Sequence, residues 1–211
     1  IMVSKRHYKS GVDDALMWLS PVGIVGGFNI MSNFSWLQNA IMIFILAFFL
    51  FYRFINMIVA GIAGAALIAV VFLTFIRFGE IAKVLAPFVV MITSALIYML
   101  VNQLLKKEKY KLYADGLLVI SFIALLSFYV GGNYFAVRET SIAMFRLNLS
   151  EGQSIPLGWV FWIFTLTIPA IYMVRGIQKK DIFLMRTGLI LVAAIVFTVR
   201  YYYHVMPVEI A

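Results

Sequence analysis

Between two arginines the chain reads FINMIVAGIAGAALIAVVFLTFI (residues 54–76), a run without Asp, Glu, Lys or Arg. A helix of about 20 apolar residues is long enough to cross the hydrocarbon core of a bilayer, so this run can span a membrane. Four more charge-free runs cover residues 15–52, 84–105, 116–137 and 152–174. The sequence therefore predicts an all-α fold, a polytopic bundle of transmembrane helices.

The composition agrees with that fold. Of the 211 residues, 64% are hydrophobic and 12% are charged, and the mean hydropathy is +1.00. Soluble globular domains carry about 25% charged residues. The polar intervals are too short for a separate soluble domain, so we expect residues 1–211 to form a single integral membrane domain. The chain opens Ile1-Met2-Val3, which fits either a start at Met2 or a piece of a longer membrane protein.

The charge-free runs divide into about seven predicted spans. The longest run is split at residues 32–35, because one continuous helix would be nearly twice as long as the hydrocarbon core is thick. Its first half contains Pro21 and three glycines, so the alternative is that this segment does not cross and six spans remain. We expect a break at Arg53 between the second and third spans. The predicted spans cover residues 15–31, 36–52, 54–76, 82–105, 112–131, 157–177 and 182–203.

The distribution of basic residues predicts the orientation. With seven spans and the N-terminus inside, 12 of the 17 Lys and Arg residues face the cytoplasm. They are Lys5, Arg6, Lys9, Arg53, Lys106, Lys107, Lys109, Lys111, Arg175, Lys179, Lys180 and Arg186. If the first segment does not cross, the division becomes 9 to 8. Because cytoplasmic loops are enriched in Lys and Arg, seven spans with the N-terminus inside and the C-terminus outside are favoured.

The charges and the missing motifs limit the classes of function. The net charge of +8 lies mostly between the spans, at the level of the headgroups, so membrane lipids and not nucleic acid are the expected partners. There is no Cys, and the two histidines, His7 and His204, fall on opposite predicted sides. No common catalytic or nucleotide-binding motif occurs. We expect no enzymatic activity, no cofactor and no metal site.

Asp115 and Arg186 are the first candidate ligand-binding residues. Both lie just inside a predicted membrane boundary, at similar depth and with opposite sign. Ionisable groups at such depth are costly and usually face a partner or a water-filled cavity. One interpretation is an anion or proton site near the inner leaflet. The other is a salt bridge between helices, or the extension of both side chains toward the headgroups.

A second candidate group lies at the predicted outer face. Arg200 follows Arg186 by about four helical turns, so the two share one face of the last helix. Guanidinium and phenol groups there could bind a phosphate or a lipid headgroup, and the alternative is an ordinary belt of aromatic and Arg residues. Residues 140–149 predict a short surface helix. The outer candidates are Arg138, Glu139, Arg200, Tyr202 and His204.

Small residues in the third span predict a close helix contact. Ala60 and Gly64, and likewise Gly61 and Ala65, are four residues apart, which lets two helix backbones approach each other. The partner helix belongs either to this chain or to another membrane protein, including a second copy.

These observations favour a multi-pass protein of the bacterial inner (plasma) membrane without catalysis of its own, a structural or assembly component of the bilayer. The alternative is a small transporter or channel for an anionic solute or lipid headgroup, with Asp115, Arg186 and Arg200 along its path.

The predicted orientation can be tested by cysteine labelling, because the natural chain has no Cys to give a background. In sealed cells, a membrane-impermeant thiol reagent should label Ser150→Cys. Lys107→Cys should react only after the membrane is permeabilised. Labelling of both positions from the same side would contradict the seven-span orientation.

Overall fold

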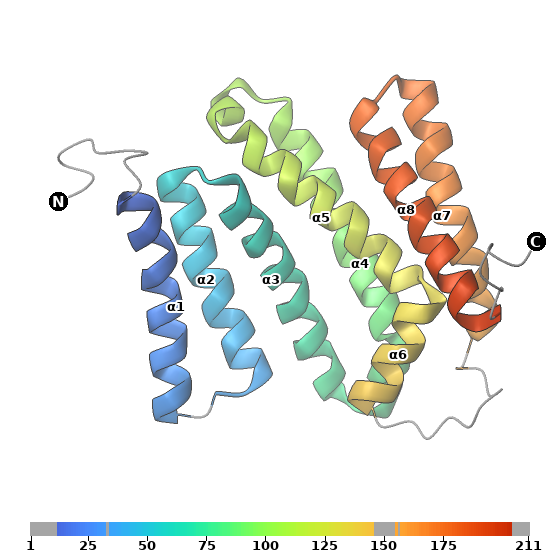
Figure 1. Cartoon of the computed structure of the whole chain (residues 1–211), viewed down its shortest axis with the longest axis horizontal. Coiled ribbons are helices and arrows are strands. Elements are labelled where there is room, and N and C mark those ends of the chain that lie inside the picture. The colour runs from blue at the N-terminus through green and yellow to red at the C-terminus, as the bar shows by residue number, and fades with distance from the viewer. Residues whose placement is uncertain (1–11, 33, 146–154, 156, 204–211) are drawn as a thin grey trace, which may run out of the picture. The chain divides into compact units, whose positions relative to one another are not determined.

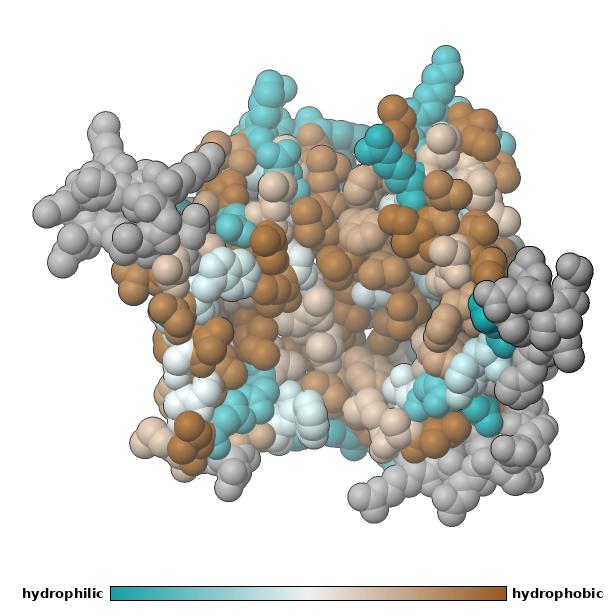
Figure 2. Space-filling model, in the orientation of Figure 1, coloured by the Kyte–Doolittle hydropathy of each residue, from teal (hydrophilic) through white to brown (hydrophobic). Residues whose placement is uncertain are grey.

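The computed structural model describes residues 12–32, 34–145, 155 and 157–203, and among them every regular element is a helix. Seven of the described helices are long and apolar enough to cross a membrane, which confirms the all-α, polytopic fold (Figure 1). Hydrophobic side chains cover the middle of the helices and hydrophilic ones gather at their ends (Figure 2). The elements are α1 (Val12–Ser32), α2 (Trp36–Phe54), α3 (Met57–Phe75), η1 (Ile76–Phe78), α4 (Glu80–Leu105), η2 (Glu108–Tyr113), α5 (Ala114–Gly132), α6 (Tyr134–Phe145), α7 (Gly158–Lys179) and α8 (Ile182–Tyr203).

The sequence predicted a break at Arg53, but the break between α2 and α3 lies beyond that residue. Arg53 is in the last turn of α2, and Ile55 adopts a left-handed conformation (φ 54°) that ends the helix. The Asn56 side-chain oxygen then accepts hydrogen bonds from the backbone N–H groups of Ile58 and Val59, at 2.9 and 3.2 Å. Asn is a preferred cap because it satisfies N–H groups that have no partner in the first helical turn.

The short helix predicted for residues 140–149 begins earlier. It is α6, which starts at Tyr134, and its first turn is capped by Asn133, whose side-chain oxygen accepts from the Ala136 N–H at 3.1 Å. Residues 146–149 lie outside the described part of the chain. The stretch from Arg138 to Phe145 is thus the continuation of a helix that starts directly after α5.

The described residues divide into two compact units, and the single integral membrane domain over residues 1–211 stays a prediction. Unit 1 comprises those up to residue 74 and residues 99–123, and unit 2 comprises residues 75–98 and those from 124 onward. Unit 1 therefore holds α1, α2, α3 and η2, and unit 2 holds α6, α7 and α8. Helices α4 and α5 contribute to both units.

In unit 1, the small residues of α3 pack against α5. A Cβ atom added at Gly61 would lie 3.0 Å from Val119 Cγ1, and one at Gly64 would lie 3.5 Å from Ile120 Cγ2. Ala60 is fully buried, whereas Ala65 is exposed. Three of the four small residues, Ala60, Gly61 and Gly64, are therefore buried in contacts within the chain. Association with another copy through this patch stays a prediction.

In unit 2, α7 and α8 form a closely packed hairpin (Figure 1). A Cβ at Gly176 of α7 would lie 2.8 Å from the backbone nitrogen of Met185, and one at Gly188 of α8 would lie 2.9 Å from Met173 Cγ. The turn between them is closed by Asp181, whose carboxylate accepts from two backbone N–H groups of α8. Glycine is required at these crossings because the helix backbones themselves are in contact.

Gly176→Ala should destabilise the hairpin, since its methyl group meets a backbone atom that cannot move independently. We expect a cost of about 1–3 kcal/mol, typical of overpacking, read as a lower melting temperature in detergent. Gly23→Ala is the matched control, because no atom lies within 4 Å of a Cβ at Gly23. Equal melting temperatures for the two variants would contradict the close α7–α8 contact.

Candidate functional site

The three charged residues predicted to line a path lie near helix ends. Asp115 is in the first turn of α5, in unit 1, and is exposed. A carboxylate there is stabilised by the positive end of the helix dipole. Arg186 and Arg200 lie on α8, in unit 2, close to its two ends, and both are exposed. The predicted pair of Asp115 and Arg186 is therefore divided between the two units.

The outer group is only partly within the described chain. Arg138 and Glu139 are neighbours on α6 and form an ion pair, with 3.2 Å between Arg138 Nη1 and Glu139 Oε1. The Arg138 side chain is 16% exposed and that of Glu139 is 40% exposed, so the pair is partly enclosed. The side chain of Tyr202 and all of His204 lie outside the described residues. Their convergence with Arg138 and Glu139 stays a prediction.

A buried polar junction, not predicted from the sequence, joins helices of unit 2 at Asn133. The Asn133 Nδ2 atom donates to the hydroxyl of Tyr129 on α5 at 2.8 Å and to Thr198 Oγ1 on α8 at 3.3 Å. The Thr198 hydroxyl in turn donates to the carbonyl of Ala194 at 2.9 Å. Asn133 is 4% exposed. One amide therefore caps α6 and holds the end of α5 against α8.

The next residue extends this junction to α7. The Tyr134 backbone N–H, in the first turn of α6, donates to Thr165 Oγ1 at 2.9 Å, and the Thr165 hydroxyl donates to the Phe161 carbonyl at 2.7 Å. Thr165 is fully buried. The sequence did carry a signal for this junction: Gly132 followed by Asn133 is typical of one helix ending and another being capped.

Two other buried hydroxyls do not form hydrogen bonds between helices within the described chain. The Ser94 and Ser121 Oγ atoms are buried without a hydrogen-bond partner among the described residues. Serine is small, so at these positions on α4 and α5 it permits close packing between helices.

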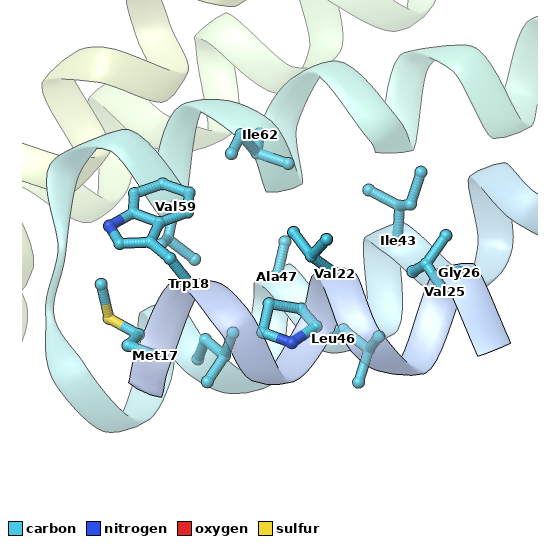
Figure 3. Close-up of a pocket in the computed structure, with 12 residues that line it drawn as sticks. Met17, Trp18, Val22, Val25, Gly26, Ile43, Leu46, Ala47, Val59 and Ile62 are labelled. Atoms are coloured by element: carbon cyan, nitrogen blue, oxygen red, sulfur yellow. The ribbon is translucent and has the colours of Figure 1, made fainter. Parts of the chain in front are cut away.

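Unit 1 contains a cavity of about 400 Å³ between α1, α2 and α3, with an almost wholly apolar lining. Met17 and Trp18 lie at one end of it, and Gly26 and Ile43 lie at the other (Figure 3). Ile62 of α3 lies across the cavity from α1. The lining comes from residues 17–26 of α1, residues 43–50 of α2 and the first turns of α3, so the cavity extends from near the α2–α3 turn to just past the middle of α1 and α2.

Beyond the cavity, toward the α1–α2 turn, the hairpin is closed by a pair of amides. Asn29 Nδ2 donates to Asn39 Oδ1 at 2.6 Å, and Asn39 Nδ2 donates back to Asn29 Oδ1 at 2.9 Å. The rings of Phe28 and Phe34 stack beside them, with 5.7 Å between centroids. Hydrogen bonds thus hold α1 and α2 together at the end where the two helices are joined, and the cavity lies between them toward the other end.

Basic residues gather at the end of unit 1 next to the cavity. The Tyr113 ring stacks on Tyr52 with 6.0 Å between centroids, and its hydroxyl donates to the Tyr52 carbonyl at 3.3 Å, so η2 lies beside the end of α2. Four acidic residues also lie here, Asp13 and Asp14 in the first turn of α1, Glu108 and Asp115, and Glu108 pairs with Lys111 at 3.5 Å. The exposed basic residues at this end are Arg53, Lys106, Lys107, Lys109 and Lys111.

Within the described chain, no group of three or more His, Cys, Asp or Glu residues could hold a metal ion. Comparison of the chain with protein-family models, curated proteins and solved structures gives no match. Evidence on function therefore comes from the arrangement of side chains.

The Asn133 junction can be measured by a double-mutant cycle with Asn133→Leu and Thr198→Val. Each change alone should lower the melting temperature, and the double variant should lose less than the sum, because both remove the same hydrogen bond. Hydrogen bonds between membrane helices average about 0.6 kcal/mol and reach about 1.7 kcal/mol, which sets the expected coupling. The exposed Thr167→Val is the control. Strict additivity would show that the two side chains do not interact.

Proposed function

We propose that this chain is an integral membrane protein without catalytic activity, a structural or assembly component of the bacterial inner membrane. The observation that supports this most is the Asn133 junction. Hydrogen bonds between buried polar groups in unit 2 join α5, α6, α7 and α8. Side chains arranged in this way make a rigid bundle.

The positions of the candidate charged residues also support this proposal. Asp115, Arg186 and Arg200 are exposed and lie within two turns of helix ends. From such positions the long arginine side chains reach the headgroup layer, where a charge costs little, and the short Asp115 side chain lies in the first turn of its helix. The positions agree with anchoring of the helices at the two membrane surfaces.

A transporter or channel for an anionic solute is the competing function. It requires Asp115, Arg186 and Arg200 to line a water-filled path. Substitution of any of these three by an uncharged residue should then abolish flux of the solute in proteoliposomes. Under our proposal, liposomes containing the natural chain show no anion flux above that of empty liposomes.

An assembly component must also have a protein partner in its native membrane. Cross-linking in intact membranes, followed by purification and mass measurement, should recover the chain in a complex of fixed stoichiometry. The exposed Ala65 lies on the predicted contact patch, so Ala65→Phe should reduce the yield of a complex that forms there, and Ile58→Phe is a control on another exposed position of α3.

Two results would contradict the proposal. One is a strictly monomeric chain without a cross-linked partner in its own membrane. The other is an anion flux that depends on Arg186 or Arg200, which would favour the transporter.

A further inference from the structure

We propose that unit 1 binds one anionic phospholipid, with an acyl chain in the cavity between α1, α2 and α3 and the phosphate among the basic residues at the adjacent end. This inference does not depend on the proposed structural role. It rests on three properties of unit 1: the chemistry of the cavity lining, the position of the cavity between the α2–α3 turn and the Asn29–Asn39 amide pair, and the charge beside it.

The lining determines what can fill the cavity. An apolar cavity of roughly 150 Å³ stays free of water and can hold a benzene molecule, and this one measures about 400 Å³. An unfilled void would cost the side chains around it their dispersion contacts. The surrounding medium consists of lipid chains, so the occupant that fits the lining is a flexible hydrocarbon chain.

The location of the cavity places the lipid in one leaflet. The lining runs from Met17 and Trp18 to Gly26, about nine residues along α1, and stops one turn before the Asn29–Asn39 amide pair. The amide pair closes the hairpin toward the other leaflet. An acyl chain therefore reaches the cavity most directly from the leaflet on the side of the α2–α3 turn, and extends to just past the middle of α1.

The charge at that side selects the headgroup. Arg53 follows the cavity-lining Leu50 by three residues on α2, which is less than one turn. The stacking of Tyr113 on Tyr52 brings η2 and its lysines to the same end. Five exposed basic residues lie there with four acidic ones, Asp13, Asp14, Glu108 and Asp115, and the remaining excess of positive charge favours an anionic phosphate-bearing headgroup over a zwitterionic one. In the predicted orientation this end faces the cytoplasm.

Native mass spectrometry of the whole chain can test the proposal. Delipidated protein in detergent is mixed with phosphatidylglycerol or with phosphatidylcholine of the same acyl composition. We expect one phosphatidylglycerol molecule to be retained, and retained more strongly than phosphatidylcholine. A phosphatidylglycerol that carries a photoreactive group in its acyl chain should cross-link to α1, α2 or α3 near Ile43 and Ile62.

Two adjacent glycines provide a matched pair of variants. Gly26 lines the cavity and Gly27 does not, and no atom lies within 4 Å of a Cβ at either position. Gly26→Phe should place a ring in the cavity and abolish lipid retention. Gly27→Phe should leave retention unchanged. Melting temperatures near that of the natural chain establish that both variants fold.

A second pair of variants tests the headgroup. Arg53→Gln should weaken phosphatidylglycerol binding about fivefold, since one Lys or Arg near an anionic surface contributes on this scale, and should weaken the binding of the zwitterionic phosphatidylcholine less. Lys179→Gln, at the end of α7 in unit 2, is the control and should have no effect.

Several results would overturn the proposal. Equal retention by Gly26→Phe and Gly27→Phe would show that the acyl chain is not in the cavity. Displacement of the lipid by inorganic phosphate at equal concentration would indicate a site for the phosphate alone. A dimer that Gly26→Phe converts to monomer, without retained lipid, would identify a second copy of the chain as the occupant.

Discussion

The structure depends on one constraint: a chain within hydrocarbon must satisfy its backbone polar groups internally. Helices satisfy that requirement, but they leave no hydrophobic driving force to hold one helix against another, because lipid is as apolar as the side chains. Cohesion then comes from close backbone approach and from polar pairs. Both occur here, as the glycines of the α7–α8 hairpin and as the amides of Asn29, Asn39 and Asn133.

The same constraint explains what the sequence could predict. A charge-free run has only one stable form in a membrane, so the fold class and the seven long helices follow from the absence of Asp, Glu, Lys and Arg. Helix ends were less predictable. Arg53 looked like a break because it is charged, yet a residue near a helix end can extend its charge to the headgroups without ending the helix. The better signals were Asn56 and Asn133, each of which caps a helix.

The candidate site was harder to predict, for a related reason. In a soluble protein the apolar face of a helix identifies its buried side, whereas here both the buried and the lipid-facing sides are apolar. The cavity between α1, α2 and α3 is therefore invisible in the hydrophobic pattern and depends on which helices are neighbours. The charged residues were visible in the sequence, but their exposure was not. Arg186 and Arg200 share a helix with the buried Thr187 and Thr198. Only the packing of α8 determines which of these side chains are exposed and which are buried.

The first helix shows how these points combine. Its predicted span is the least buried of the seven described ones, and it is held mainly by the Asn29–Asn39 amides at one end and by Met17 packed against Phe51 and Val59 at the other. Between these contacts Gly26 lines the cavity without a side chain to fill it, and the neighbouring glycines at 23 and 27 likewise add no bulk to this stretch of α1. A helix made of such residues cannot complete the core of unit 1 by itself. Lipid is the medium on that side of the helix, so a lipid chain is the natural component to complete the packing.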